Sequence, residues 1–150
     1  MPTRNTSPVR DQALGQLLID AVRLLRRDFY QRARGLNLTP ALSRLLFSVH
    51  RHPGATQVEL AAHLEVTPVT LSRMLDRLVK FKYVRRVADP ADRRIFRVYV
   101  DSDGEPLVGR MAALSAKTTN KALAGMSKTE QAALERLLSM LCNNLAGGAD

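Results

Sequence analysis

The sequence predicts a mainly α-helical fold with one small β-hairpin. Apolar residues recur at helical spacing over most of the 150 residues, and the exception is a pair of short runs, rich in β-branched and aromatic residues, within 83–100. Hydrophobic residues make up 45% of the chain and charged residues 25%, which is ordinary for a globular protein. We therefore expect a single domain, residues 1–150, built from two closely joined parts.

Two helices are expected in the first third of the chain. A long one spans about residues 9–34, because apolar residues keep one face while arginines occupy most of the rest. A second helix begins at Thr39-Pro40, where threonine can cap the first turn and proline fits the first helical position. It ends before Pro53-Gly54. The apolar face of the long helix consists of Leu14, Leu17, Leu18, Ala21, Leu25 and Phe29.

A pair of short helices joined by a tight turn follows. The first opens at Thr56 with Glu59 three residues later, a spacing at which each side chain can satisfy a backbone donor of the other. After a break at Glu65-Val66, the second starts at Thr67-Pro68 and runs to about residue 81. Leucines at helical spacing, Leu71, Leu75 and Leu78, predict its inner face.

The outer face of the second helix carries hydroxyl groups early and guanidinium groups later. This pattern suits the major groove of DNA, because arginine pairs with guanine and small residues meet the thymine methyl group. The alternative is a solvated amphipathic helix without a ligand. We predict base contacts from Thr67, Pro68, Thr70, Ser72, Arg73 and Arg77, and contacts to the DNA backbone from Thr56, Gln57 and Lys80.

The hairpin has a basic tip. Its expected strands are residues 83–87 and 95–100, separated by a turn-forming stretch, 89–94, that contains two arginines. Such a tip can enter the minor groove, where narrow A·T stretches attract arginine. In the alternative interpretation the arginines only solvate the turn and pair with Asp89 and Asp92. We predict minor-groove contacts from Asp92, Arg93 and Arg94.

Positive charge is concentrated in this part of the chain. Residues 67–100 hold nine Lys/Arg against three Asp, a net +6 of the chain's +9. That concentration is typical of a surface that displaces counterions from phosphates. Aromatic residues in the region are few and lie where a core needs them, which favours double-stranded DNA over a stacking platform for single strands.

Residues 67–79 together with the hairpin motif Asp89-Pro90-Ala91-Asp92-Arg93-Arg94 resemble the recognition helix and wing of the MarR family of bacterial transcriptional regulators. The resemblance extends over nearly the whole chain. It implies a winged helix-turn-helix over about 38–101, terminal helices that form an obligate homodimer, Arg94 as the minor-groove residue and Asp92 as the residue that holds the tip in shape. One departure is Val100-Asp101-Ser102 in place of the usual Leu-Thr, which predicts a different start for the next helix.

The terminal helices offer more apolar surface than one small core would consume. A helix is expected over about 105–125, and Ser127 with Glu130 forms a second capping box that opens a final helix to about residue 146. Together with the helix at residues 9–36 they predict a dimer. Two recognition helices related by a two-fold axis match a palindromic site with half-sites about one helical turn apart.

Several other classes of protein are disfavoured. The sequence contains no phosphate loop, nucleophile elbow or HExxH motif, so we predict neither an enzyme nor a bound cofactor. The three histidines lack carboxylates or thiols at ligand spacing, and no metal site is predicted. The single Cys142 fits a reducing compartment and a structural thiol; a disulfide across a dimer axis stays an alternative. The polar residues Met1–Ser7 carry no secretory signal, and no segment is apolar enough for a membrane, which predicts the cytoplasm.

Two functional hypotheses follow. The leading one is a dimeric repressor that binds a palindromic operator and whose affinity is changed by a small molecule bound between its two parts; aromatic effectors are implied by the family resemblance alone. The runner-up is an architectural or non-sensing DNA-binding protein of the same fold. A third, more distant hypothesis is a protein-interaction module based on the long helices.

Overall fold

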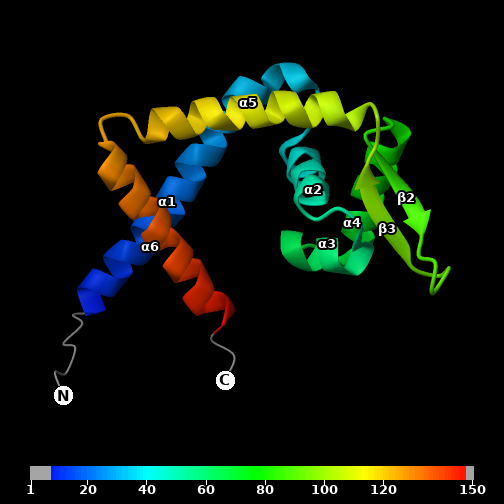
Figure 1. Ribbon diagram of the computed structural model, residues 1–150, viewed down its shortest axis with the longest axis horizontal. Helices are drawn as coiled ribbons and strands as arrows, with labels where there is room; N and C mark the ends of the chain where they lie inside the picture. The colour runs from blue at the N-terminus through cyan, green and yellow to red at the C-terminus, as the bar shows by residue number, and fades with distance from the viewer. Residues whose placement is uncertain (1–7, 148–150) are drawn as a thin grey trace.

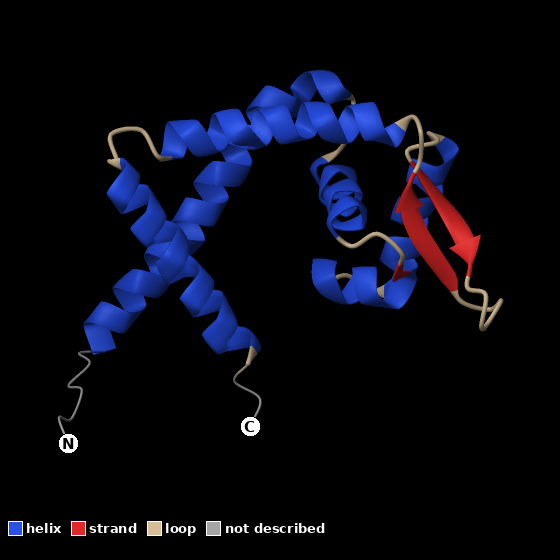
Figure 2. Cartoon of the chain, in the orientation of Figure 1, coloured by secondary structure: helices blue, strands red, loops and turns tan. Residues whose placement is uncertain are grey.

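The computed structural model describes residues 8–147, so the predictions for Met1–Ser7 and for the last three residues fall outside the described part. Helices account for most of it, and one small sheet lies at one end (Figure 2). The elements in chain order are α1 (Pro8–Arg32), a 3-10 helix η1 (Ala33–Leu36), α2 (Pro40–Arg51), β1 (Ala55–Thr56), α3 (Gln57–Leu64), α4 (Pro68–Lys80), β2 (Val84–Ala88), β3 (Phe96–Val100), α5 (Gly104–Ala122) and α6 (Lys128–Ala146). The predicted mainly α-helical fold with a hairpin is confirmed.

Four helices begin where their capping residues predict. Thr39, Thr56, Thr67 and Ser127 each accept a hydrogen bond from a backbone N–H of the first helical turn. Two helix ends differ from the prediction. The α-helical part of α1 stops at Arg32, because the chain tightens into η1 and then reverses at a left-handed residue, Asn37 with φ 54°. The expected helix over 105–125 ends at Ala122, and the reversal to α6 passes through Gly125 with φ 85°.

The sheet has one strand more than the hairpin predicted. Its order is β1-β3-β2, and both pairings are antiparallel. The strand β1 holds only Ala55 and Thr56, which pair with Val98 and Arg97 of β3. Two residues are too few to show the alternation by which a strand is recognised in a sequence. Through this short strand the hairpin is hydrogen-bonded to the segment that opens α3.

The core joins the helix pair to the hairpin. Leucines from α2, α3 and α4 meet valines of the two long strands and the first turns of α5. The side chains that are 0% exposed are Leu45, Leu46, Val49, Leu60, Leu71, Leu75, Leu78, Val98 and Met111. The inner face predicted for α4 is thus buried, and its outer face is fixed toward solvent.

Helix α5 connects the sheet to the far end of the molecule. It starts beside the hairpin, runs along the top of the view, and leads to α6, which descends on the opposite side from α3 and α4 (Figure 1). Its start is tightly packed, since a Cβ atom on Gly104 would lie 2.1 Å from the carbonyl oxygen of Tyr83. The Asp101 carbonyl accepts from the N–H groups of Gly104 and Glu105, and no side chain caps the helix.

A cluster of polar side chains ties α1 to α5. The carboxylate of Asp28 accepts hydrogen bonds from Arg32 at 2.6 Å, from the Lys121 ammonium at 2.5 Å and from the Thr118 hydroxyl at 2.9 Å. The hydrogen bond from Arg32, followed by those from Lys121 and Thr118, holds the pKa of Asp28 far below its ordinary value. The two helices are therefore linked by polar contacts as well as by packing.

Candidate nucleic-acid interface

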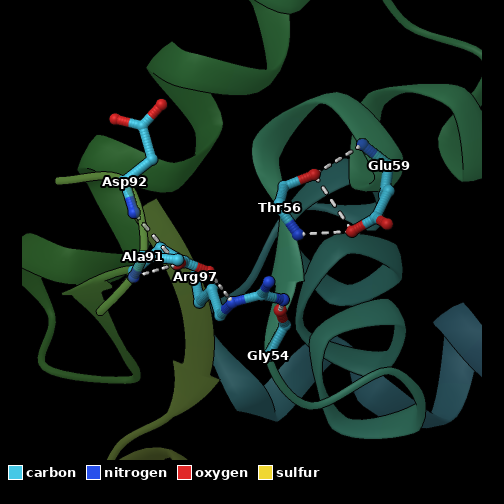
Figure 3. Close-up of polar contacts among 7 residues, drawn as sticks. Gly54, Thr56, Glu59, Ala91, Asp92 and Arg97 are labelled. Carbon is cyan, nitrogen blue, oxygen red and sulfur yellow. Dashed lines mark hydrogen bonds and ion pairs between the residues drawn. The ribbon is translucent and has the colours of Figure 1, made fainter. Parts of the chain in front are cut away.

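The N-terminus of α3 is held by a reciprocal capping box. The backbone N–H of Thr56 donates to Glu59 Oε2 at 2.7 Å, and the N–H of Glu59 donates to Thr56 Oγ1 at 3.3 Å (Figure 3). The Thr56 N–H, and then the Thr56 hydroxyl, which donates to Glu59 Oε2 at 3.0 Å, lower the pKa of Glu59. Thr56 and Gln57, two residues predicted to contact the DNA backbone, lie half-buried at this helix start.

The turn into α4 places its first residues in solvent. Glu65 takes a left-handed conformation, φ 54°, which ends α3 and reverses the chain. The Thr67 hydroxyl then accepts from the N–H of Thr70 at 3.2 Å and donates to the Thr70 hydroxyl oxygen at 2.9 Å. Both threonines are exposed, but the Thr67 hydroxyl also serves as the helix cap.

The outer face of α4 carries most of the predicted major-groove residues. The exposed residues are Pro68, Arg73, Arg77 and Lys80, together with the two threonines. Ser72, in contrast, is half-buried and lies toward the edge of this face. One residue was missed: Val69, 63% exposed, lies among them. An apolar residue on an amphipathic helix is normally assigned to the core, so only its place between Pro68 and Thr70 could have indicated it.

An ion pair holds α4 against the hairpin. Arg86 Nη1 of β2 donates to Asp76 Oδ1 of α4 at 2.8 Å. A second contact lies within the sheet, where the Arg85 guanidinium of β2 is 5.4 Å from the centre of the Tyr99 ring of β3. The ion pair links α4 to β2, whereas the Arg85–Tyr99 contact links β2 to β3.

The tip of the hairpin presents arginine on a structured turn. Arg94 pairs with Asp92 through two contacts of 3.1 Å, and its own N–H donates to Asp92 Oδ1 at 3.0 Å. Hydrogen bonds from Arg94 lower the pKa of Asp92. The Arg94 side chain is nevertheless 90% exposed, and Arg93 is exposed as well. The pairing foreseen in the alternative interpretation therefore exists, and it leaves the Arg94 side chain projecting from the turn.

Sequence reasoning also missed Arg97, which it counted as a cation and gave no role. Arg97 pairs with Asp89 at the base of the same turn. The two residues are eight positions apart on opposite sides of the hairpin. The sequence does not show which residues of the two strands face each other, so it gives no direct signal of this pair.

His52 and His63 stack with ring centres 4.4 Å apart, and Cys142 is exposed on α6. Among residues 13–147, whose side chains the structure describes, no three His, Cys, Asp or Glu side chains are arranged to hold a metal ion. In the same range, none of the helices combines the length and the apolar character needed to cross a membrane.

Comparison with known proteins gives a consistent result. Residues 38–96 match the family model described as MarR family. The transcriptional regulator PA3341 is 32% identical, with 89% of this chain and 98% of that chain covered and a TM-score of 0.78. Wild-type MarR from Escherichia coli is 29% identical, with 85% and 95% covered and a TM-score of 0.75. The repressor CouR, solved on a 23-mer DNA duplex, is 23% identical, with 93% and 99% covered and a TM-score of 0.73, and shows the fold alone.

Proposed function

Because the chain belongs to the MarR family of transcriptional regulators and has their winged-helix fold, we propose that it acts as a homodimeric repressor that binds a palindromic DNA operator through α4 and the hairpin tip. One observation carries this proposal. The leucines of α4 are fully buried while its opposite face, with Arg73, Arg77 and Lys80, is exposed next to a hairpin whose Arg94 is 90% exposed. One folded part of the chain therefore carries both a helix suited to the major groove and an arginine suited to the minor groove.

The contacts divide by the type of DNA group they recognise. We propose that Thr67, Pro68, Thr70, Ser72, Arg73 and Arg77 read base edges, that Thr56, Gln57 and Lys80 contact phosphates, and that Asp92, Arg93 and Arg94 form the minor-groove tip. The first-turn N–H groups of α3 and the Gln57 side chain suit phosphate contacts, which position a protein on DNA without reading its sequence. Base-edge contacts from α4 then supply specificity, at about 1–3 kcal/mol for each good bidentate pair.

The second copy of the chain is supported by the terminal helices. Within the described part of α6 no residue is buried, and Leu137 and Leu145 are 52% and 79% exposed. Leu24 of α1 is 50% exposed. Helices α1, α5 and α6 together line an apolar groove of about 810 Å³. Burying such a surface in a dimer removes a large apolar area from water, at about 25 cal/mol per Å².

Effector control would act through the same helices. Helix α5 begins next to the hairpin and ends in the part that we assign to the dimer (Figure 1). A small molecule that prefers one tilt of α5 would shift the population toward one spacing of the two recognition helices. An aromatic effector bound between the DNA-binding part and the dimer part is the proposed ligand, on the basis of family membership.

Selection of bound fragments from genomic DNA, followed by gel shifts, tests the proposal. We expect one palindromic motif, an affinity that falls steeply with salt, and an operator at least about a thousandfold tighter than random DNA. Phenolic compounds are then added to the selected complex. An architectural protein would show the salt dependence with little preference for the operator, and a protein-interaction module would show neither.

Single substitutions distinguish the proposed major-groove contacts from the proposed minor-groove contact. Arg73→Ala and Arg77→Ala are expected to relax base preference at individual operator positions, at about 1–3 kcal/mol each. Arg94→Ala is expected to weaken binding through the hairpin, with the major-groove preferences retained. Binding by the Arg94 variant as tight as that of the wild type would contradict the minor-groove assignment.

A further inference from the structure

Arg97 connects the hairpin to the corner between α2 and α3. Its Nε donates to Asp89 Oδ2 at 2.5 Å, and its Nη1 donates to the Gly54 carbonyl oxygen at 3.0 Å. Figure 3 shows the guanidinium reaching from β3 to Gly54, next to the Thr56–Glu59 capping box. One planar fork thus bridges two segments that lie more than thirty residues apart in the chain.

On the hairpin side, Asp89 organises the tip. Its side chain is 9% exposed, and Oδ1 accepts from the N–H of Ala91 at 2.8 Å and of Asp92 at 3.3 Å. Its backbone N–H donates to the Ile95 carbonyl at 2.8 Å, which closes the turn. The Ala91 N–H, then the Arg97 guanidinium, lower the pKa of Asp89. The carboxylate that shapes the turn is therefore itself held by Arg97.

On the helix side, Gly54 leads directly into α3. Its N–H donates to the Val98 carbonyl at 2.9 Å, and Thr56, the capping residue of α3, lies opposite Arg97 in the β1–β3 pairing. Gly54 has φ 80°, and a Cβ atom there would lie 2.9 Å from the Tyr99 hydroxyl oxygen. The corner is therefore packed directly against β3, and Arg97 fastens it at the point where the tip begins.

We propose that Arg97 is a positioning residue for DNA binding: it holds the tip that carries Arg94 at a fixed place relative to α3 and α4. This rests on the proposed DNA-binding function. The reason is geometric, because a flexible tip would have to be ordered at each binding event, and that ordering costs affinity. A lysine in place of Arg97 would have one point charge and could not offer the same planar pair of donors to both partners.

A double-mutant cycle separates positioning from direct contact. The probe is the tightest duplex that the wild-type protein selects from a random-sequence pool, at one fixed salt concentration. We expect Arg97→Met to weaken binding by about tenfold, and to weaken it by less than about twofold when Arg94→Ala is already present, because residues that act as a unit are not additive. In the matched cycle with Arg73→Ala, which changes α4, the two effects are expected to multiply.

Three further measurements test the positioning role against other roles. Arg97→Lys is expected not to restore the affinity; full rescue by the lysine would make charge alone sufficient and overturn the proposal. In the Arg94→Ala background, Arg97→Met is expected to leave the salt slope unchanged. A slope reduced by about one there would make Arg97 a direct phosphate contact. In the DNA-free protein, the amides of Ala91 and Asp92 are expected to exchange hydrogen faster in Arg97→Met than in the wild type.

The outcomes distinguish this inference from the function on which it rests. A wild-type protein that selects no duplex would overturn both. A wild-type protein that binds tightly, with Arg97→Met and Arg94→Ala effects that multiply, would overturn the positioning role and leave the proposed function intact. Unchanged exchange at Ala91 and Asp92 would likewise remove the structural basis of the proposal.

Discussion

The two ends of the molecule use the same amphipathic pattern with opposite results. In the winged-helix part, leucines such as Leu45 and Leu75 are 0% exposed within one chain. The terminal helices also carry leucines at helical spacing, but Leu24 of α1 and Leu137 of α6 are 50% and 52% exposed. The first part closes its core by itself, whereas the second leaves an apolar face in solvent. Under the proposed function, a second copy of the chain covers that face.

The largest expected effect comes from a charge placed on the exposed apolar face. Leu24→Glu puts a carboxylate into the groove lined by α1, α5 and α6, and burying it without a partner in a dimer would cost several kcal/mol on each protomer. Sedimentation at micromolar concentration is expected to show a dimer for the wild type and a monomer for the variant.

The matched control is Val58→Glu, because Val58 is 73% exposed on α3, in the part that closes its own core. This variant should stay dimeric. If Leu24→Glu also stayed dimeric, the groove would not be the interface and the contrast between the two ends would need another explanation.

A pair of leucine truncations gives the next largest effect. Leu75→Ala removes a fully buried side chain of α4 and is expected to lower the free energy of unfolding by about 2–5 kcal/mol. Leu137→Ala on α6 should cost much less in a monomeric background such as Leu24→Glu, and more in the dimer. Urea unfolding of both variants in both backgrounds measures the difference. Equal costs for Leu137→Ala in the two backgrounds would show that the partner does not cover this residue.

Most of the fold could be predicted because its boundaries are local. Capping threonines and serines with proline or glutamate at fixed spacing mark helix starts through contacts within one turn, and all four starts appear at the predicted residues. Burial in the helix pair followed from the leucine period in the same way. The hairpin needed only a turn signal between two β-rich runs.

The parts that escaped prediction depend on pairings between distant residues. The strand β1 exists only because Ala55 and Thr56 lie against β3. The contact of Arg97 with the Gly54 carbonyl spans more than forty residues and has no local pattern. Val69 was missed because an apolar side chain on an amphipathic helix indicates burial, and only its 63% exposure in the folded chain shows otherwise.

The polar link between α1 and α5, within the terminal helices, can be tested by pH. Because the pKa of Asp28 is lowered by Arg32 and then by Lys121, its stabilisation is complete above the ordinary carboxyl value of 3.8 and is lost as the pH falls through the lowered folded value. Asp28→Asn should therefore melt at a lower temperature than the wild type at neutral pH, and the gap should narrow as the pH falls below about 3.

Asp20→Asn serves as the control for Asp28→Asn. The pKa of Asp20 is lowered too, by Gln16 and then Arg23, but both partners lie on α1 itself. At neutral pH the melting temperature of Asp20→Asn should lie closer to that of the wild type than the melting temperature of Asp28→Asn does, since no contact between helices is removed. A gap for Asp20→Asn as large as that for Asp28→Asn would show that the Asp28 cluster contributes nothing beyond stability within α1.

The smallest effect comes from the two capping boxes, one at each end of the molecule. Thr56→Ala and Ser127→Ala remove equivalent caps, from α3 and α6, each worth about 1 kcal/mol of helix stability. Because α3 buries Leu60 in the core, Thr56→Ala should lower the free energy of global unfolding by the full value of the cap, whether or not a dimer forms. Helix α6 has no buried residue. Ser127→Ala should therefore lower the free energy of unfolding only in the dimer, and should have no effect on it in the Leu24→Glu background. An equal cost of Ser127→Ala in both backgrounds would mean that α6 is held by its own chain, and the exposed face would then not depend on a partner for its order.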